Sequence, residues 1–174
     1  VEERKQAFFD FMDDYVRREN QRVLTLRAAL TPLYEVARDG VSLSRVERET
    51  LDAIAVEYEL DLASMSERDL TAELMLRVDQ LPTSLVLAQA ATESAWGTSR
   101  FARQANNLFG QWCFSEGCGV VPSRRAQGAS HEVRAFASVE EAVRAYFHNL
   151  NTHDTYDYLR RLRSDMRRRD EPLD

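Results

Sequence analysis

Apolar side chains recur at the spacing of an α-helix along most of this chain, and this period constrains its fold more than any other feature. Between Glu2 and about Leu30 it predicts one long helix with a wide apolar face, because residues three and four apart share one side of a helix. Pro32 and Gly40 follow as helix breakers. The apolar face consists of Phe8, Phe11, Met12, Tyr15, Val16, Val23, Leu26 and Leu30.

Serines mark the starts of further predicted helices. Ser44 with Glu47, and Ser138 with Glu141, have the spacing of a capping box, in which the serine oxygen and the glutamate satisfy free backbone N–H groups. Ser66 precedes a stripe of leucines at helical spacing. The pattern therefore indicates a mainly α protein.

A boundary between helices is predicted at the Leu81-Pro82 step, because proline disfavours helix at the residue before it. The charge composition of the chain also changes near this step. Residues 1–80 carry 18 acidic and 11 basic side chains, whereas residues 81–174 carry 11 and 12. We predict a helical N-terminal region over residues 1–80, packed on a second domain over residues 81–165. A charged tail follows over residues 166–174.

Composition excludes several classes of function. The formal net charge of −6 argues against a nucleic-acid partner, which requires concentrated positive charge. No apolar run approaches the roughly 18 residues that a membrane span needs. Lys5 is the only lysine, so a phosphate-binding P-loop lysine or a Schiff base elsewhere in the chain is excluded. We expect a monomer without a cofactor.

The two cysteines, Cys113 and Cys118, lie five residues apart around a glycine-containing turn. A hairpin disulfide can close this spacing in an oxidising compartment, and we favour that interpretation. Two free thiols remain an alternative. A zinc site borrowing His131 is another, although a cysteine pair with one distant histidine leaves a ligand missing, and we expect no metal.

The second domain begins with an alanine-rich apolar helix, predicted between Pro82 and Gly97, that is expected to be buried. Aromatic residues and glycine turns between Leu108 and Gly119 predict a small hairpin, and Glu132 to Phe136 predicts another short strand.

Glu93 falls in the last turn of this apolar helix. The negative end of the helix dipole and poorly solvating neighbours such as Ala90 and Ala95 both predict a raised pKa for its carboxyl group. A carboxyl group that stays protonated near neutral pH can act as a general acid toward a glycosidic oxygen. The alternative is a buried glutamate neutralised by Arg100 or Arg103.

Amide and aromatic side chains cluster in sequence around Glu93, and this mixture is typical of carbohydrate sites. Rings cover the apolar faces of a sugar and amides bind its hydroxyl groups. The alternative, above all for Phe109, is an ordinary core aromatic. His131, His148 and His153 lack metal-binding spacing and are expected at the surface or at helix ends. The candidate substrate-binding residues are Gln89, Trp96, Asn107, Phe109, Gln111 and Trp112.

Two segments, Leu85 to Gly97 and Asn106 to Gly110, closely resemble the glucosaminidase domain shared by the flagellar muramidase FlgJ and bacterial autolysins. The resemblance covers about residues 81–160. The segments that look most like the Bax-type proteins of Gram-negative bacteria are Gln111 to Phe114, the Cys118-Gly119 turn and His148 to His153.

The resemblance implies a lysozyme-like, mainly α domain with a small β-hairpin lobe, acting on peptidoglycan glycan strands. It implies cleavage of the β-1,4 bond on the reducing side of N-acetylglucosamine, with Glu93 as the catalytic acid. A family tyrosine that orients water or the N-acetyl group falls on Tyr156. The implied location is the periplasm, with any signal or anchor segment expected to be absent from this chain.

One departure from the family concerns a second glutamate that many members carry on the hairpin lobe. It would fall near residues 123–125, where this chain has no acid, and the nearest acids are Glu116 and Glu132. A mechanism with two carboxylates is therefore in doubt, and we favour assistance by the N-acetyl group of the substrate. The alternatives are a lytic transglycosylase or muramidase on the same fold, and a non-catalytic wall-binding module.

Overall fold

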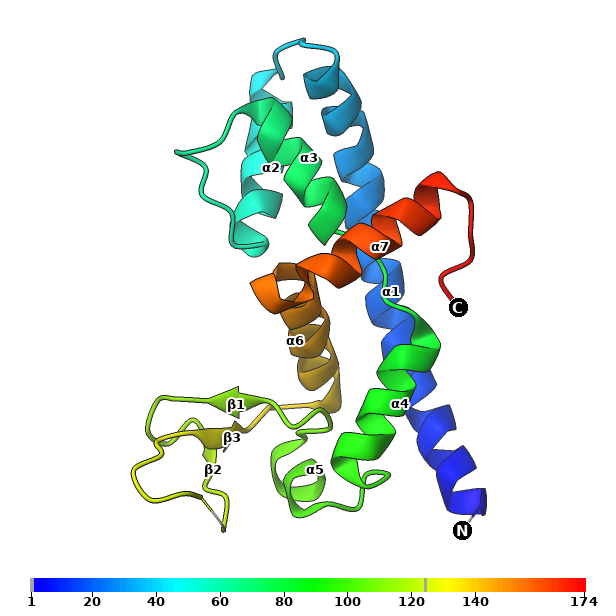
Figure 1. Ribbon diagram of the computed structural model, residues 1–174, viewed down its shortest axis with the longest axis vertical. Coiled ribbons are helices and arrows are strands. Elements are labelled where there is room, and N and C mark those ends of the chain that lie inside the picture. The colour runs from blue at the N-terminus through cyan, green and yellow to red at the C-terminus, as the bar shows by residue number, and fades with distance from the viewer. Residues whose placement is uncertain (1, 124) are drawn as a thin grey trace. The chain divides into compact units, whose positions relative to one another are not determined.

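The computed structural model describes residues 2–123 and 125–174, and within them the protein is mainly α with one small β lobe (Figure 1). None of the helices in these residues is both long enough and apolar enough to cross a membrane. In chain order the elements are α1 (Glu2–Arg38), α2 (Arg45–Glu57), α3 (Glu67–Arg77), α4 (Thr83–Ser94), α5 (Arg100–Ala105), β1 (Trp112–Cys113), β2 (Gly119–Val120), β3 (Glu132–Arg134), α6 (Val139–Thr152), the 3-10 helix η1 (Asp154–Tyr156) and α7 (Asp157–Arg168).

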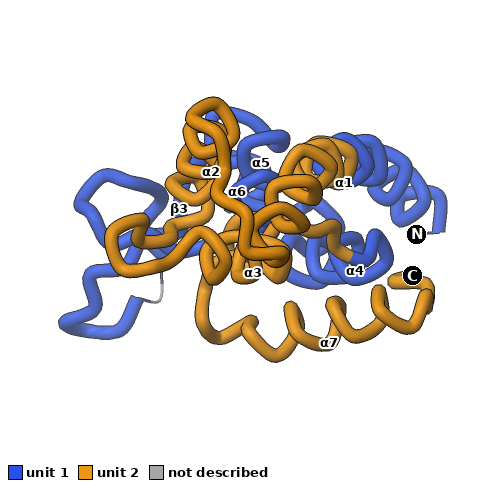
Figure 2. Tube along the Cα trace, turned by 90° about the horizontal axis from the view of Figure 1, so that it is seen from above, with its two compact units in different colours: residues 1–19, 82–147 blue, residues 20–81, 148–174 orange. Residues whose placement is uncertain are grey.

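Contacts divide the chain into two compact units (Figure 2). The first unit joins residues 1–19 to residues 82–147, and the second joins residues 20–81 to residues 148–174. Helices α1 and α6 contribute to both units. One boundary coincides with the Leu81-Pro82 step, whereas the predicted three-part division of the chain stays a prediction.

The first unit is built around the small side chains of α4. Val86, Ala90 and Ala91 are buried on one stripe of this helix, as the alanine-rich sequence predicts. The helix ends at Ser94, earlier than predicted, where Ala95 adopts the left-handed conformation with a φ of 50° and the Ser94 hydroxyl accepts from the N–H of Gly97. The core of this unit also includes Phe8, Met12, Val16, Leu108, Phe109, Val133, Phe136, Val143 and Phe147.

The β lobe of the first unit is a three-stranded antiparallel sheet in the order β1-β3-β2. The predicted hairpin is therefore wrong, since β1 and β2 each pair with β3 and not with one another. Gly119 makes this order possible, because a Cβ atom there would lie 1.9 Å from the carbonyl oxygen of Val133 in the central strand.

The second unit is a helical bundle. Its helices α2 and α3 begin where the serines predict. Ser44 and Glu47 form the complete capping box, and the Ser66 hydroxyl accepts from the N–H of Asp69. The prediction that α1 ends before Pro32 is wrong, because the helix continues to Arg38. Buried residues of the second unit include Val23, Leu30, Leu33, Ala37, Leu51, Ile54, Tyr58, Leu70, Leu74 and Leu150.

A buried ion cluster joins α7 to the end of α3 within this unit. Asp79 is 2% exposed, and Arg167 of α7 donates to both of its carboxylate oxygens at 2.5 Å. Arg163, also buried, donates to the backbone carbonyls of Leu76, Asp79 and Gln80. A guanidinium group has five donors in a fixed plane and can bind several carbonyls at once, which a lysine ammonium cannot do with the same geometry.

Candidate functional site

Glu93 lies in the last turn of α4, as the sequence predicts, but its side chain is exposed to solvent. The expectation of a poorly solvated carboxyl group is therefore wrong. The buried stripe of α4 runs through Ala90 and Ser94, so Glu93 and Gln89, one turn before it, are on the solvent side. This exposure leaves the Glu93 carboxyl group accessible to a substrate from outside.

The carboxyl group of Glu93 lies over the loop that precedes β1. A Cβ atom on Gly110 would be 3.0 Å from the Glu93 Oε2 atom, and Gly110 has a positive φ of 65° that favours glycine. Because the Cα atoms of Gly110 and Trp112 can be at most about 7 Å apart, the carboxyl group is also near the start of β1.

The backbone after α4 has an unusual conformation. Ala95, Trp96 and Gly97 all have positive φ angles, of 50°, 59° and 74°, which are rare for a bulky residue such as tryptophan. Residues held in such conformations often occur at functional sites, where the surrounding structure maintains them. Here the chain must turn sharply directly after the candidate acid.

The predicted substrate residue Trp96 packs inside the first unit. Its ring makes edge contacts with Phe8 and Phe9 of α1, with centroids 6.0 and 5.1 Å apart, and the Lys5 ammonium lies 5.1 Å from its centre. Phe109 is buried and stacks on Tyr146 at 4.1 Å. These contacts support the structural alternative for both aromatic rings.

Asn107 is also occupied within the protein. Its amide nitrogen donates to the carbonyls of Gln111 and Arg134, and its amide oxygen accepts from the N–H of Gln111. The side chain of Gln111 donates weakly to the carbonyl of Ala142 at 3.4 Å. Asn107 thus holds the turn that carries Gly110 beneath Glu93.

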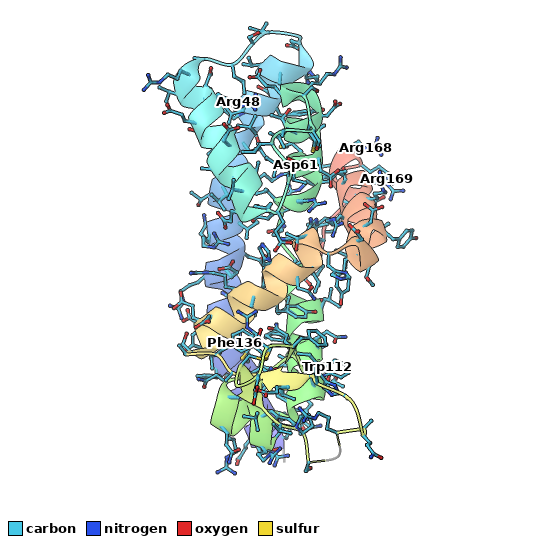
Figure 3. All side chains as sticks on the ribbon, turned by 90° about the vertical axis from the view of Figure 1, so that its left-hand side faces the viewer. Arg48, Asp61, Trp112, Phe136, Arg168 and Arg169 are labelled. Carbon is cyan, nitrogen blue, oxygen red and sulfur yellow. A yellow bond between two sulfur atoms is a disulfide. The ribbon has the colours of Figure 1, made fainter. Side chains whose placement is uncertain are left out.

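Among the predicted aromatic substrate residues, Trp112 is the one whose side chain is exposed. It lies at the β lobe (Figure 3) and is 57% exposed. One face of its indole stacks on His131, with ring centroids 4.1 Å apart. Phe114, two residues later and 71% exposed, is a further aromatic that the sequence reasoning missed. Its position at i+2 from Trp112 was the signal that could have identified it.

The predicted disulfide is confirmed between Cys113 and Cys118, whose Cα atoms are 6.2 Å apart. The Glu132 carboxylate of β3 lies beside it and accepts from the N–H groups of Gly117 and Gly119, at 3.1 and 2.8 Å. The two sulfur atoms lie near this carboxylate, but each is bonded to the other and neither is a thiolate, the form in which cysteine binds zinc.

Glu132 therefore stabilises the β lobe through two backbone hydrogen bonds, and the pH dependence of this stabilisation can be predicted. The backbone hydrogen bond from Gly117, followed by the one from Gly119, lowers the pKa of Glu132. The folded pKa lies below the unfolded one, so the stabilisation is complete above the unfolded value and is lost as pH falls through the folded pKa. We expect the amide NMR signals of both glycines to move together at a pH below 4.5, the ordinary value for glutamate.

Glu132→Gln is the control for this titration. It should remove the pH-dependent movement at Gly117 and Gly119 while Trp112 and Val133 keep their pairing. Movement of the two amide signals at or above the ordinary pKa of a glutamate would contradict the prediction.

The remaining candidates lie in the second unit or outside the described residues. Tyr156 ends η1 and is half-buried, and its predicted catalytic role stays a prediction. His153 caps η1 by accepting from the N–H of Thr155, and the His148 ring contacts the carbonyl of Glu57, so both follow the surface and helix-end expectation. Of the positions expected for a second glutamate, residue 124 lies outside the residues that the structure describes.

Comparison with known proteins gives one family and one curated relative. The family model Glucosaminidase, described as mannosyl-glycoprotein endo-beta-N-acetylglucosaminidase, matches residues 69–170. The chain is 36% identical over 170 residues to Protein bax of Escherichia coli strain K12, a match that covers 98% of this chain and 59% of that relative. No solved structure matches.

Proposed function

We propose, since this chain belongs to the glucosaminidase family, that it hydrolyses peptidoglycan as an endo-β-N-acetylglucosaminidase. In this proposal it cuts the β-1,4 bond on the reducing side of N-acetylglucosamine, and Glu93 is the general acid. The observation that carries the proposal is the exposed Glu93 carboxyl group at the end of α4, over Gly110. The disulfide and the relative from Escherichia coli support a periplasmic location.

In the first step Glu93 donates its proton to the glycosidic oxygen as the bond from that oxygen to C1 of the sugar breaks. The carbonyl oxygen of the neighbouring N-acetyl group then forms a bond to C1, which stabilises the developing positive charge. In the second step water attacks C1, the ring formed by the acetyl group opens, and the Glu93 carboxylate accepts a proton from the water. The products are an alcohol and a reducing sugar.

The use of a substrate group in place of a second carboxylate is supported by the β lobe. Between Gly97 and Ser138 the sequence contains two acids, Glu116 and Glu132. Glu132 already accepts two backbone hydrogen bonds, and Glu116 is exposed in the loop that the disulfide closes. A mechanism with one protein carboxyl group fits this arrangement better than one with two.

For binding, we propose that the sugar next to the scissile bond lies on the open face of Trp112. One face of this indole is held by His131, so the ring is fixed before the substrate arrives, which reduces the entropy lost on binding. Gln89 lies on the same exposed side of α4 as Glu93 and can bind sugar hydroxyl groups. Trp96, Asn107 and Phe109 are assigned to the scaffold.

Gly110→Ala is expected to lower kcat by up to about tenfold, because the new Cβ atom would shift the Glu93 carboxyl group by a few tenths of an ångström, and a shift of about 1 Å costs about 100-fold. The added Cβ atom would meet the Glu93 Oε2 atom at 3.0 Å. The measurement is the rate of release of soluble fragments from purified peptidoglycan, with the melting temperature recorded in parallel.

Gly128→Ala is the matched control, because Gly128 also has a positive φ, of 85°, but a Cβ atom there meets nothing within 4 Å. It should carry the same backbone strain and keep kcat. Equal losses of activity in the two variants would show that strain, and not the contact with Glu93, is responsible.

Product analysis tests the proposed activity itself. Digestion of purified peptidoglycan, followed by mass spectrometry of the fragments, should show new reducing ends on N-acetylglucosamine. Anhydro-muramic ends would instead identify a lytic transglycosylase, and new reducing ends on muramic acid a muramidase. Binding to peptidoglycan without release of fragments would indicate a wall-binding module.

A further inference from the structure

The buried Asp79 of the second unit is surrounded by more positive charge than it can neutralise. Three guanidinium groups approach its carboxylate within the described residues, those of Arg167 at 2.5 Å, Arg27 at 3.6 Å and Arg163 at 3.8 Å. Removal from water lowers the pKa of Arg163 to about 10 and also lowers that of Arg27. One carboxylate thus serves three partly desolvated cations.

Backbone carbonyls compensate part of this excess. Arg27 donates to the carbonyls of Met75 and Val78, and Arg163 donates to that of Leu76, all near the carboxyl end of α3. The end of a helix is equivalent to about half of one negative charge. The two positive charges that Asp79 does not balance exceed the partial charge of this helix end, so positive charge remains in excess in the cluster.

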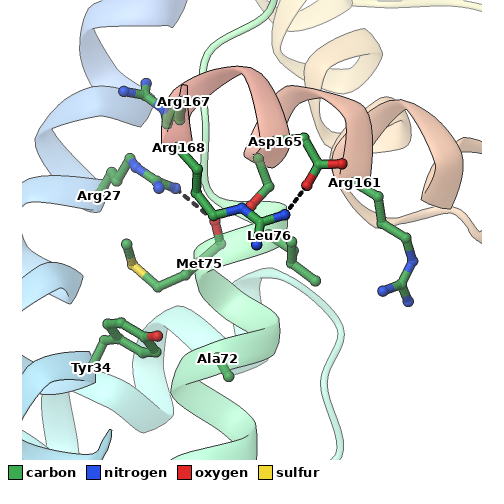
Figure 4. Close-up of a pocket in the computed structure, with 10 residues that line it drawn as sticks. Arg27, Tyr34, Ala72, Met75, Leu76, Arg161, Asp165, Arg167 and Arg168 are labelled. Atoms are coloured by element: carbon green, nitrogen blue, oxygen red, sulfur yellow. Dashed lines mark hydrogen bonds and ion pairs between the residues drawn. The ribbon is translucent and has the colours of Figure 1, made fainter. Parts of the chain in front are cut away.

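A pocket of about 610 Å³ opens directly beside this cluster, between α1, α3 and α7 (Figure 4). Of the ten described residues that line it, four are arginines and one, Asp165, is acidic. Two of the arginines, Arg27 and Arg167, come from the cluster around Asp79. The other two, Arg161 and Arg168, lie on the surface of α7 and pair with Asp157 and Asp165.

The remaining lining is suited to a small organic group. Met75 and Leu76 provide apolar surface, and Tyr34 of α1 lies at one side, with its hydroxyl group directed toward the pocket in Figure 4. The planar donors of arginine match the two oxygens of a carboxylate or the oxygens of a phosphate. A ligand with an oxyanion at one end and an apolar part at the other would match both the arginines and the apolar side chains of the lining.

We infer that this pocket binds an oxyanion, a carboxylate or a phosphate, on its arginine lining, which consists of Arg27, Arg161, Arg167 and Arg168. The bound anion supplies the negative charge that the cluster around Asp79 lacks. This binding is independent of the proposed glycan hydrolysis, because it uses residues of the second unit alone and Glu93 belongs to the first.

The test titrates inorganic phosphate into the full chain at constant ionic strength and follows the side-chain N–H signals of the arginines by NMR. We expect saturable shifts at Arg27 and Arg167. The double variant Arg161→Ala/Arg168→Ala should bind about tenfold more weakly, since bonds between charged groups are the strong ones. Arg45→Ala is the control, because Arg45 is an exposed arginine of the same unit with one acidic partner, Glu49, and should leave the affinity unchanged.

A second arm identifies the source of the anion. A short acetylated peptide with a free terminal carboxylate is compared with the same peptide as its amide. Competition of the free acid with phosphate supports a carboxylate ligand, and binding of phosphate alone supports a phosphate ligand. The inference is overturned if no probe gives saturable shifts, or if Arg45→Ala weakens binding as much as the double variant. Should the double variant fail to fold, wild-type shifts spread evenly over all exposed arginines overturn it as well.

Discussion

Glu93→Gln should slow the release of fragments from peptidoglycan by about 100-fold to 10,000-fold, the range expected when a general acid is removed. The amide has nearly the same shape as the carboxyl group and cannot donate an acidic proton. Because Glu93 is exposed and accepts no hydrogen bond from the part of the chain that the structure describes, the melting temperature should stay at the wild-type value. The measurement is the initial rate on purified peptidoglycan at equal protein concentration.

The matched control is Glu116→Gln, an exposed glutamate of the same unit in the loop that the disulfide closes. It should keep the wild-type rate. If Glu116→Gln lost activity and Glu93→Gln kept it, the assignment of the acid would be wrong while the family and the proposed reaction could stand. If neither variant changed the rate, a mechanism in which Glu93 is the single catalytic acid would be excluded.

Asp79→Asn should lower the free energy of unfolding by about 3–5 kcal/mol, the effect of removing one partner from a buried ion pair. Arg163 and Arg167 would then keep their positive charges without the carboxylate that faces them. The measurement is urea denaturation followed by circular dichroism, in which the variant should unfold at a clearly lower urea concentration.

Glu49→Gln provides the comparison for Asp79→Asn. It removes the partner of Arg45 from an ion pair that is exposed on both sides, and such pairs contribute little. Its free energy of unfolding should lie within about 0.5 kcal/mol of the wild type. Similar losses in the two variants would mean that burial does not determine the contribution of Asp79.

Local signals in the sequence were reliable where the physics is local. A capping serine acts on N–H groups two or three residues away, so Ser44 and Ser66 correctly indicate the starts of α2 and α3. Pro32 was misleading because the burial of Leu33 and Ala37 on the continuing apolar stripe favours the helix beyond it. Tertiary packing here outweighs the hydrogen bond that a proline removes.

In the candidate site too, local features could be predicted from the sequence, whereas features that depend on tertiary packing could not. The position of Glu93 at a helix end follows from the sequence around it, but its exposure depends on which side of α4 packs against the rest of the unit. The alanines beside it in sequence are compatible with either side. Likewise, the residues near Asp79 in sequence do not predict its contact with Arg163, which is 84 residues away and lies beside it only in the folded chain.

The order of strands in the β lobe has a consequence for how this part of the protein forms during synthesis. The two outer strands, β1 and β2, leave the ribosome first, and the strand that both need, β3, comes last. A nascent chain that ends before Glu132 contains both outer strands without the strand with which either pairs. The aromatic surface around Trp112 therefore takes its final form only after the chain has passed that point.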